Sequence, residues 1–231
     1  MIRTPPRRSN APRTKRTRTI TRKRVYGPRA GTFGLPLVVP RPFPLPPLLR
    51  NTLKYSERIN VGLNASNLGS NVFGANTLFS CNLSTAGHQP LCWDQLTLIY
   101  RKAAVVSSKI TYTCHPGIYS YTVIGLVDDD TNISTGTLGL YPAGERPYSK
   151  AKVVGATGSN AVYLTSYYNC ENHFGKGAVT NDAQQNSPSA NASEVAVFGI
   201  FVNGIGSMTC IIDVTIEYFV QWSEFESILA S

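Results

Sequence analysis

The feature that most constrains the fold is a strict alternation of apolar and other residues in the last part of the sequence. Every even-numbered residue of the segment 208–222 is apolar: Met208, Cys210, Ile212, Val214, Ile216, Tyr218, Val220 and Trp222. A period of two places these side chains on one face of a β-strand, while Thr209, Asp213, Thr215, Glu217 and Gln221 face the other way. Such a strand would span about 50 Å if unbroken, so we expect a bend or a bulge in it.

Shorter segments of the same kind precede this strand. Runs rich in β-branched and aromatic residues predict strands at residues 53–63, 78–83, 105–114, 119–127, 150–154, 161–168 and 194–203. The polar segments 64–76 and 169–193 are predicted loops, and the length of the second predicts exposure. One helix is expected at residues 95–104, with Asp94 as its N-cap. About eight strands and one short helix predict an all-β fold, a single antiparallel sandwich.

Positive charge is segregated into the first part of the sequence. Residues 1–50 hold 13 of the 22 Lys and Arg residues and no acid, whereas residues 51–231 hold nine cations against 13 acids. Residues 1–30 contain eleven of these cations: Arg3, Arg7, Arg8, Arg13, Lys15, Arg16, Arg18, Arg22, Lys23, Arg24 and Arg29. Because so charged a segment cannot offset its own ordering entropy, we expect a disordered basic arm there.

An arm of this composition is suited to nucleic acid, because each Lys or Arg that contacts the phosphate backbone releases condensed counterions without recognising sequence. All eleven cations are therefore candidate nucleic-acid-binding residues. Six of them also form a candidate nuclear localisation signal: Lys15, Arg16, Arg18, Arg22, Lys23 and Arg24. A purely solvated tail is the alternative. A mitochondrial transit peptide is disfavoured, since the arm lacks periodic apolar residues.

Residues 31–50 form a proline-rich connector between the arm and a body at residues 51–231. Prolines at 36, 40, 42, 44, 46 and 47 exclude a helix and predict an extended, polyproline-like conformation. The apolar residues between them, among them Phe33 and Phe43, suggest a connector that lies on a protein surface. A PxxP ligand for a peptide-recognition module is the alternative. No apolar run approaches the ~20 residues that span a bilayer, so we expect no membrane insertion.

The body carries no pattern typical of catalysis or of a metal site. Its five cysteines are scattered and odd in number, which favours core cysteines over a disulfide framework or a zinc site. Phosphate-binding loops, zinc-protease motifs and the serine-hydrolase elbow are absent, so we expect neither an enzyme nor a cofactor. Asp128, Asp129 and Asp130 could hold a hard cation, but a solvated turn is the favoured interpretation.

Two segments of the body resemble capsid proteins of circoviruses and their relatives, which are circular single-stranded DNA viruses. Residues 87–113, GHQPLCWDQLTLIYRKAAVVSSKITYT, are similar to a region where a Pro-x-x-x-Asp element precedes a short helix with a tyrosine and then a strand. Residues 214–225, VTIEYFVQWSEF, are similar to the closing strand of these capsids. The resemblance implies a jelly roll that assembles as sixty copies into a T=1 icosahedral shell, with the basic arms on a single-stranded DNA genome.

The same resemblance implies a location in the virion, and in the host nucleus during assembly, with a nuclear import receptor and a host surface receptor as partners. Long loops, especially residues 169–193, are the candidates for host contact. Two alternatives stay open. One is a jelly-roll capsid of a small RNA virus, and the other is a non-viral nucleic-acid-binding β-module whose surface aromatics, such as Tyr163, Tyr167 and Tyr168, contact bases.

Overall fold

A computed structural model of the chain describes residues 46–85, 87–129, 133, 140–206 and 208–225. The predicted arm and most of the predicted connector lie outside these residues. The described part is built mainly of strands, with three short α-helices and two 3-10 turns at Ala178–Thr180 and Asp182–Gln184. The strands are β1 (Leu48–Gly62), β2 (Leu68–Gly74), β3 (Tyr100–Cys114), β4 (Tyr121–Asp128), β5 (Lys150–Val154), β6 (Val162–Asn169), β7 (Gln185–Asn186), β8 (Val197–Asn203) and β9 (Thr209–Phe225), and the helices are α1 (Trp93–Thr97), α2 (Leu140–Glu145) and α3 (Cys170–Phe174).

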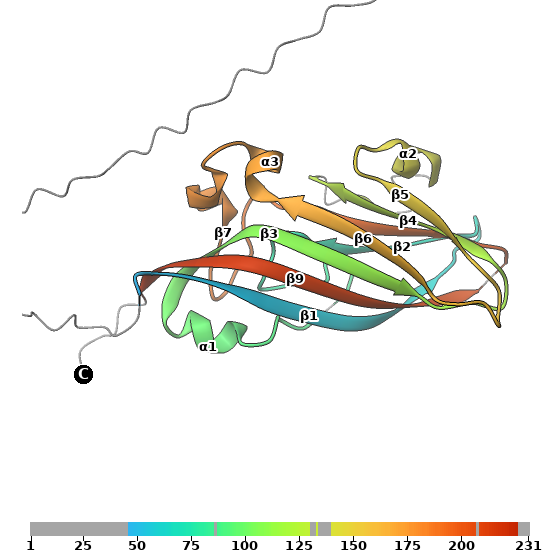
Figure 1. Cartoon of the computed structure of the whole chain (residues 1–231), viewed down its shortest axis with the longest axis horizontal. Helices are drawn as coiled ribbons and strands as arrows, with labels where there is room; N and C mark the ends of the chain where they lie inside the picture. Colours follow the sequence, from blue (N-terminus) through green and yellow to red (C-terminus); the bar gives the residue numbers. More distant parts are fainter. Residues whose placement is uncertain (1–45, 86, 130–132, 134–139, 207, 226–231) are drawn as a thin grey trace, which may run out of the picture. The chain divides into compact units, whose positions relative to one another are not determined.

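The strands form two antiparallel sheets (Figure 1). The first, here called the β9 sheet, has the order β1-β9-β3-β6, with the short β7 paired to β3. The second, here called the β8 sheet, has the order β2-β8-β4-β5. Most successive strands thus pass from one sheet to the other, except that β5 follows β4 within the β8 sheet and β7 follows β6 within the β9 sheet. The final strand lies between the first and the third. Apart from β7, this is the eight-strand arrangement of a jelly roll, so the predicted fold class is confirmed.

The alternation in the sequence forms β9 as predicted. All eight even-numbered apolar residues from 208 to 222 are buried, and they pack with large side chains such as Trp93, Tyr55 and Phe198 in the core between the sheets. Of the bend or bulge expected in this strand, β9 curves (Figure 1) but has no interruption, since it runs for 17 residues. The irregularity lies instead in its neighbour β3, where the register shifts between Val105 and Ser107.

The early strands differ most from the prediction. The segment 64–76, predicted as a loop, contains β2, whereas residues 78–83, predicted as a strand, form none. The reason is that the β8 sheet is covered on both faces. Its outer face packs in a second apolar cluster that includes Leu126, Phe201 and Ala143 of α2. A strand buried on both faces shows no alternation of apolar and polar residues. The Gly and Asn residues of β2 also make its sequence resemble that of a loop.

The predicted helix at residues 95–104 is also wrong in extent. Helix α1 covers only Trp93–Thr97, its N-cap is Cys92 rather than Asp94, and β3 already begins at Tyr100. The helical spacing of Tyr100 is overridden by tertiary packing, because its buried ring stacks on Phe225 at a centroid distance of 5.4 Å while β3 pairs with β9. The expectation of a single helix is corrected by α2 and α3.

Strand β1 begins earlier than predicted, so the last residues of the predicted connector belong to the body. Leu48 already pairs with Ser223, and the Arg50 guanidinium donates two hydrogen bonds to Gln221 Oε1, at 3.0 and 2.7 Å. This pairing covers Gln221, which was expected to be exposed. The Tyr100 hydroxyl donates to the Pro46 carbonyl at 2.8 Å. Residues 46–50 of the predicted connector therefore belong to the body.

The segment 169–193, predicted as an exposed loop, is partly buried. It contains α3, both 3-10 turns and β7. Asn186 in β7 is fully buried, and its side chain accepts hydrogen bonds from the amides of Leu78 and Ala192 and donates to the carbonyls of Asn76 and Ala103. Three of these four hydrogen bonds, those with Leu78, Asn76 and Ala103, hold the segment against the core, and the fourth lies within the segment. Across the described residues, no helix is long and apolar enough to cross a membrane.

Candidate nucleic-acid interface

The cations predicted to bind nucleic acid, from Arg3 to Arg29, lie outside the described residues, so their assignment stays a prediction. The described surface that bears on the same function is the outward face of the β9 sheet. Its side chains align in rows across the strands. One row holds Lys54, Glu217, Lys109 and Tyr167, and the next but one holds Arg58, Asp213, Thr113 and Tyr163.

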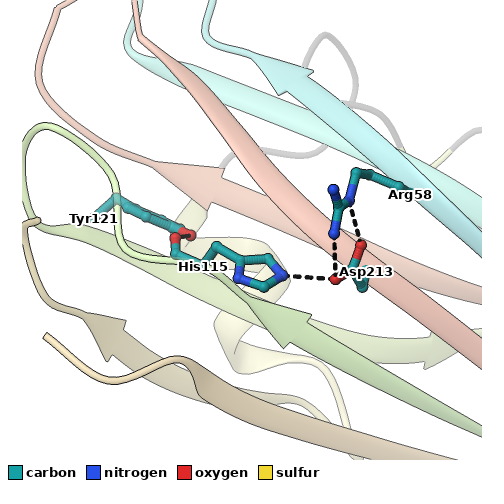
Figure 2. A network of polar contacts seen from close by, with 4 residues as sticks. All are labelled: Arg58, His115, Tyr121 and Asp213. Atoms are coloured by element: carbon teal, nitrogen blue, oxygen red, sulfur yellow. Dashed lines mark hydrogen bonds and ion pairs between the residues drawn. The ribbon is translucent and has the colours of Figure 1, made fainter.

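Most charges on this face are neutralised by one another. Arg58 and His115 both bind Asp213, as Figure 2 shows: Arg58 Nε donates to Oδ1 at 2.6 Å, and His115 Nε2 lies 2.6 Å from Oδ2. The hydrogen bonds from Arg58 and then from His115 hold the pKa of Asp213 well below its usual range. The His115 carbonyl accepts a hydrogen bond from the Tyr121 hydroxyl, which fixes the backbone at that position.

Two further cations, Lys109 and Lys102, follow the same pattern and make three ion pairs. Lys109 Nζ lies 3.9 Å from Glu217 Oε2, and Lys102 Nζ lies 2.8 Å from Glu224 and 2.9 Å from Asp182. The outward face of the β9 sheet therefore presents mixed rather than uniformly positive charge. Such a face gives weaker and less salt-dependent attraction to phosphate than the arm would.

The edge where β5 meets β6 differs, because its lysines have no acidic partner among the described residues. Lys150 Nζ donates to the Thr165 carbonyl at 2.7 Å, and Lys152 Nζ donates to the Tyr163 carbonyl at 2.8 Å. Lys150 Nζ also lies 5.6 Å from the centroid of the Tyr167 ring, within the range of a cation–π contact. This edge combines cations with exposed aromatic rings.

Of the three tyrosines named from the sequence, Tyr163 and Tyr167 are exposed on the outward face of the β9 sheet. Tyr168 is buried and faces the core, because consecutive residues of β6 point to opposite faces. Burial raises the pKa of its hydroxyl. Tyr168 therefore cannot offer a ring face to a base, and the prediction for this residue was wrong.

The structure also places the five cysteines and Asp128 of the acidic cluster, whereas Asp130 lies outside the described residues. Cys81, Cys114, Cys170 and Cys210 are buried, as expected of core cysteines, and burial raises the pKa of the Cys81 thiol to about 12. Cys92 is exposed, contrary to that expectation. Asp128 is buried and paired with Arg146 at 2.7 Å, so the solvated-turn interpretation fails for it. No group of three His, Cys, Asp or Glu residues in the described part of the chain is arranged to hold a metal ion.

Sequence reasoning missed several polar residues that the fold brings to this face. Arg58 and His115 meet Asp213 only through the pairing of β1 and β3 with β9. The outward position of Asp213 in the alternation was a usable signal that a cation faces it. Asn172 and His173 reach the Tyr167 region through α3, which no local pattern predicted.

No protein-family model matches the sequence, and comparison with curated proteins finds no match either. Among solved structures, the chain is similar to the mud crab tombus-like virus structure (TM-score 0.48, 10% identity, covering 78% of this chain and 90% of that one). It is similar to a 60-mer of the BFDV capsid protein (TM-score 0.45, 13% identity, covering 80% of this chain and 97% of that one). It is also similar to the desmodium yellow mottle tymovirus structure (TM-score 0.41, 16% identity, covering 85% of this chain and 98% of that one). At these identities the jelly-roll assignment rests on the strand order of the chain itself.

Proposed function

We propose that this chain is the coat subunit of a small icosahedral virus. In this proposal sixty copies form a T=1 shell, and the basic arms hold a single-stranded DNA genome inside it. The observation that carries the proposal is the combination of eleven cations in residues 1–30 with a body of jelly-roll strand order and mildly acidic composition. The arm supplies sequence-independent affinity for phosphate, and the sandwich supplies a rigid body with surfaces for contacts between copies.

The charge of the arm is of a useful size for packaging. Sixty copies, each with thirteen cations in residues 1–50, would bring about 780 positive charges into the shell, enough to neutralise several hundred phosphates. The body has a net negative charge and cannot replace this contribution. The preference for DNA over RNA rests on the resemblance of residues 87–113 and 214–225 to capsids of circular single-stranded DNA viruses.

The arm has a second proposed role as a nuclear localisation signal. The dense cluster from Lys15 to Arg24 is of the kind that import receptors bind, and the same residues would meet the genome after import. In the proposal the protein therefore passes through the host nucleus before it becomes part of the virion. A variant with these six cations changed to glutamine should stay in the cytoplasm of transfected cells.

The decisive experiment compares three full-length proteins by negative-stain electron microscopy and by nuclease treatment of the nucleic acid they retain. The wild type should form uniform closed shells that protect single-stranded DNA. A variant with all eleven arm cations changed to glutamine should retain none, because no counterions are released on contact. The matched control changes every arm arginine to lysine, keeps the charge, and should package as the wild type does.

Two results would overturn the proposal. Monomers or dimers of the wild type that persist when single-stranded DNA is added would contradict a coat subunit. A glutamine variant that packages as much nucleic acid as the wild type would contradict the role of the arm. The protected nucleic acid would then be extracted from the shells and treated again. If ribonuclease degrades it and deoxyribonuclease does not, the proposal passes to an RNA genome.

A further inference from the structure

Tyr167 stands between two hollows on the surface of the body. Its side chain is 63% exposed. On one side lies a hollow of about 270 Å³ that is also lined by Tyr148, Asn172 and His173. On the other side lies a hollow of about 420 Å³ that is lined by Thr52, Lys109, Glu217 and Phe219. Tyr167 lines both hollows together with the two residues that follow it, so the end of β6 separates two adjacent concave sites.

The first hollow is lined by polar and aromatic side chains, of which the exposed Asn172 amide can reach the edge of a base. His173 Nε2 is buried and has no hydrogen-bond partner among the described residues. The Asn172 side-chain amide likewise makes no hydrogen bond within the described part, since only its backbone amide is engaged, by Asn169. Tyr148 contributes a second exposed aromatic ring. No carboxylate is among the described residues that line this hollow.

Cations lie beside both hollows. Lys150 lies over the Tyr167 ring and is held there by its hydrogen bond to the Thr165 carbonyl. In the second hollow Lys109 lies near Glu217, at 3.9 Å, a distance at which the ammonium stays available to another anion. An exposed aromatic ring with cations nearby is an arrangement that single-stranded nucleic acid uses, with bases stacked on the ring and phosphates beside the ammonium groups.

We propose that the Tyr167 site binds single-stranded nucleic acid, with an unpaired base stacked on the face of the ring that Lys150 leaves open and flanking phosphates near Lys150 and Lys109. A duplex does not fit this geometry, because its bases are already stacked on one another and cannot stack on a side chain. The site accepts any base, since every base has a flat face to stack. This inference rests on the proposed function, and it adds a contact on the body to the contacts that the arm makes with nucleic acid.

The experiment uses the full-length protein and single-stranded oligothymidine that carries 5-iododeoxyuridine, cross-linked by light at low and at high salt. High salt weakens the phosphate contacts of the arm but leaves stacking largely intact. We expect an adduct on the peptide that contains Tyr167 at both salt concentrations. Tyr167→Ala should remove this adduct and lower the affinity at high salt about tenfold, a typical effect of losing one stacking platform.

Two variants serve as controls. Tyr167→Phe keeps the ring and should keep both the adduct and the affinity. Tyr119→Ala removes an exposed tyrosine that lines neither hollow and should bind as the wild type does. Unchanged high-salt affinity of Tyr167→Ala, or adducts confined to residues 1–30, would overturn the inference while leaving the proposed function intact.

A second measurement tests the competing occupant, which is another copy of this chain. Hydroxyl-radical footprinting of shells emptied of nucleic acid should leave Tyr167 reactive, and the addition of oligothymidine should protect it. Protection in the empty shells would assign this surface to a contact between copies and overturn the inference. Absence of both shells and nucleic-acid binding would instead contradict the proposed function itself.

Discussion

At the scale of single residues, the pairing of Asp213 has a consequence for acid stability. Arg58 and His115 both bind its carboxylate, and they lower its pKa from the ordinary value of about 3.9. A carboxylate with a lowered folded-state pKa contributes stability at pH values above its unfolded pKa, and this contribution is lost as the pH falls through the folded value. The loss should therefore begin below about pH 4.

The corresponding prediction compares Asp213→Asn with the wild type by urea unfolding at pH 7 and at pH 3. The variant should have the lower free energy of unfolding at pH 7, by a modest amount because the pair is partly exposed, and the gap should narrow at pH 3. The control is Glu145→Gln, which removes an exposed carboxylate of α2 that pairs with no described residue. Its free energy of unfolding should differ little from that of the wild type at both pH values. An equal gap for Asp213→Asn at both pH values would contradict the assignment.

At the scale of elements, the side chain of Asn186 is a main anchor of the segment from α3 to β7, beside the pairing of β7 with β3. Asn186 uses both amide hydrogens and accepts twice at its oxygen, and its partners Leu78, Ala192, Asn76 and Ala103 are all buried. Removal of its amide leaves buried backbone donors and acceptors without partners, at about 1–3 kcal/mol for each group left unsatisfied.

Asn186→Ala should therefore lower the free energy of unfolding by at least about 3 kcal/mol, as measured by chemical denaturation. The matched control is Asn60→Ala on the exposed side of β1, which should change it by less than about 0.5 kcal/mol. Equal effects of the two substitutions would show that the segment is not anchored through Asn186. Hydrogen exchange at Leu78 and Ala192 should also accelerate in Asn186→Ala, because both amides lose their acceptor.

The strands differ in how far the sequence could predict them. Strand β9 was predictable because it is buried on one face only, so the pattern of residues 208–222 is visible without the structure. Strand β2 was not, since the β8 sheet is buried on both faces and covered by Ala143 and Ile133. The residues of the candidate site likewise include some that the sequence could predict and some that it could not. The exposure of Tyr163 and Tyr167 follows from alternation, but the approach of His173 depends on α3 and on contacts between elements distant in sequence.

At the scale of the whole molecule, the proposed binding divides between an arm whose sequence is rich in positive charge and a body in which several cations pair with acids. Arg58, Lys102 and Lys109 already pair with acids of the body. The eleven cations of residues 1–30 therefore dominate the electrostatic part of nucleic-acid binding in the proposed function. Stacking at Tyr167 would add a part that depends little on salt.

This division predicts the salt dependence of binding. For single strands, the logarithm of the association constant falls with the logarithm of salt concentration by about 0.7 for each phosphate contact. Eleven arm contacts give a slope of up to about −8, measurable by fluorescence anisotropy of a labelled oligonucleotide with the full-length protein. A variant with Lys15, Arg16, Arg18, Arg22, Lys23 and Arg24 changed to glutamine keeps five arm cations, and its slope should be about −3.5. Tyr167→Ala should lower the affinity at every salt concentration without changing the slope, because it removes stacking and no charge. Equal slopes for the glutamine variant and the wild type would contradict this prediction. They would mean that the phosphate contacts lie on the body, although the body has a net negative charge.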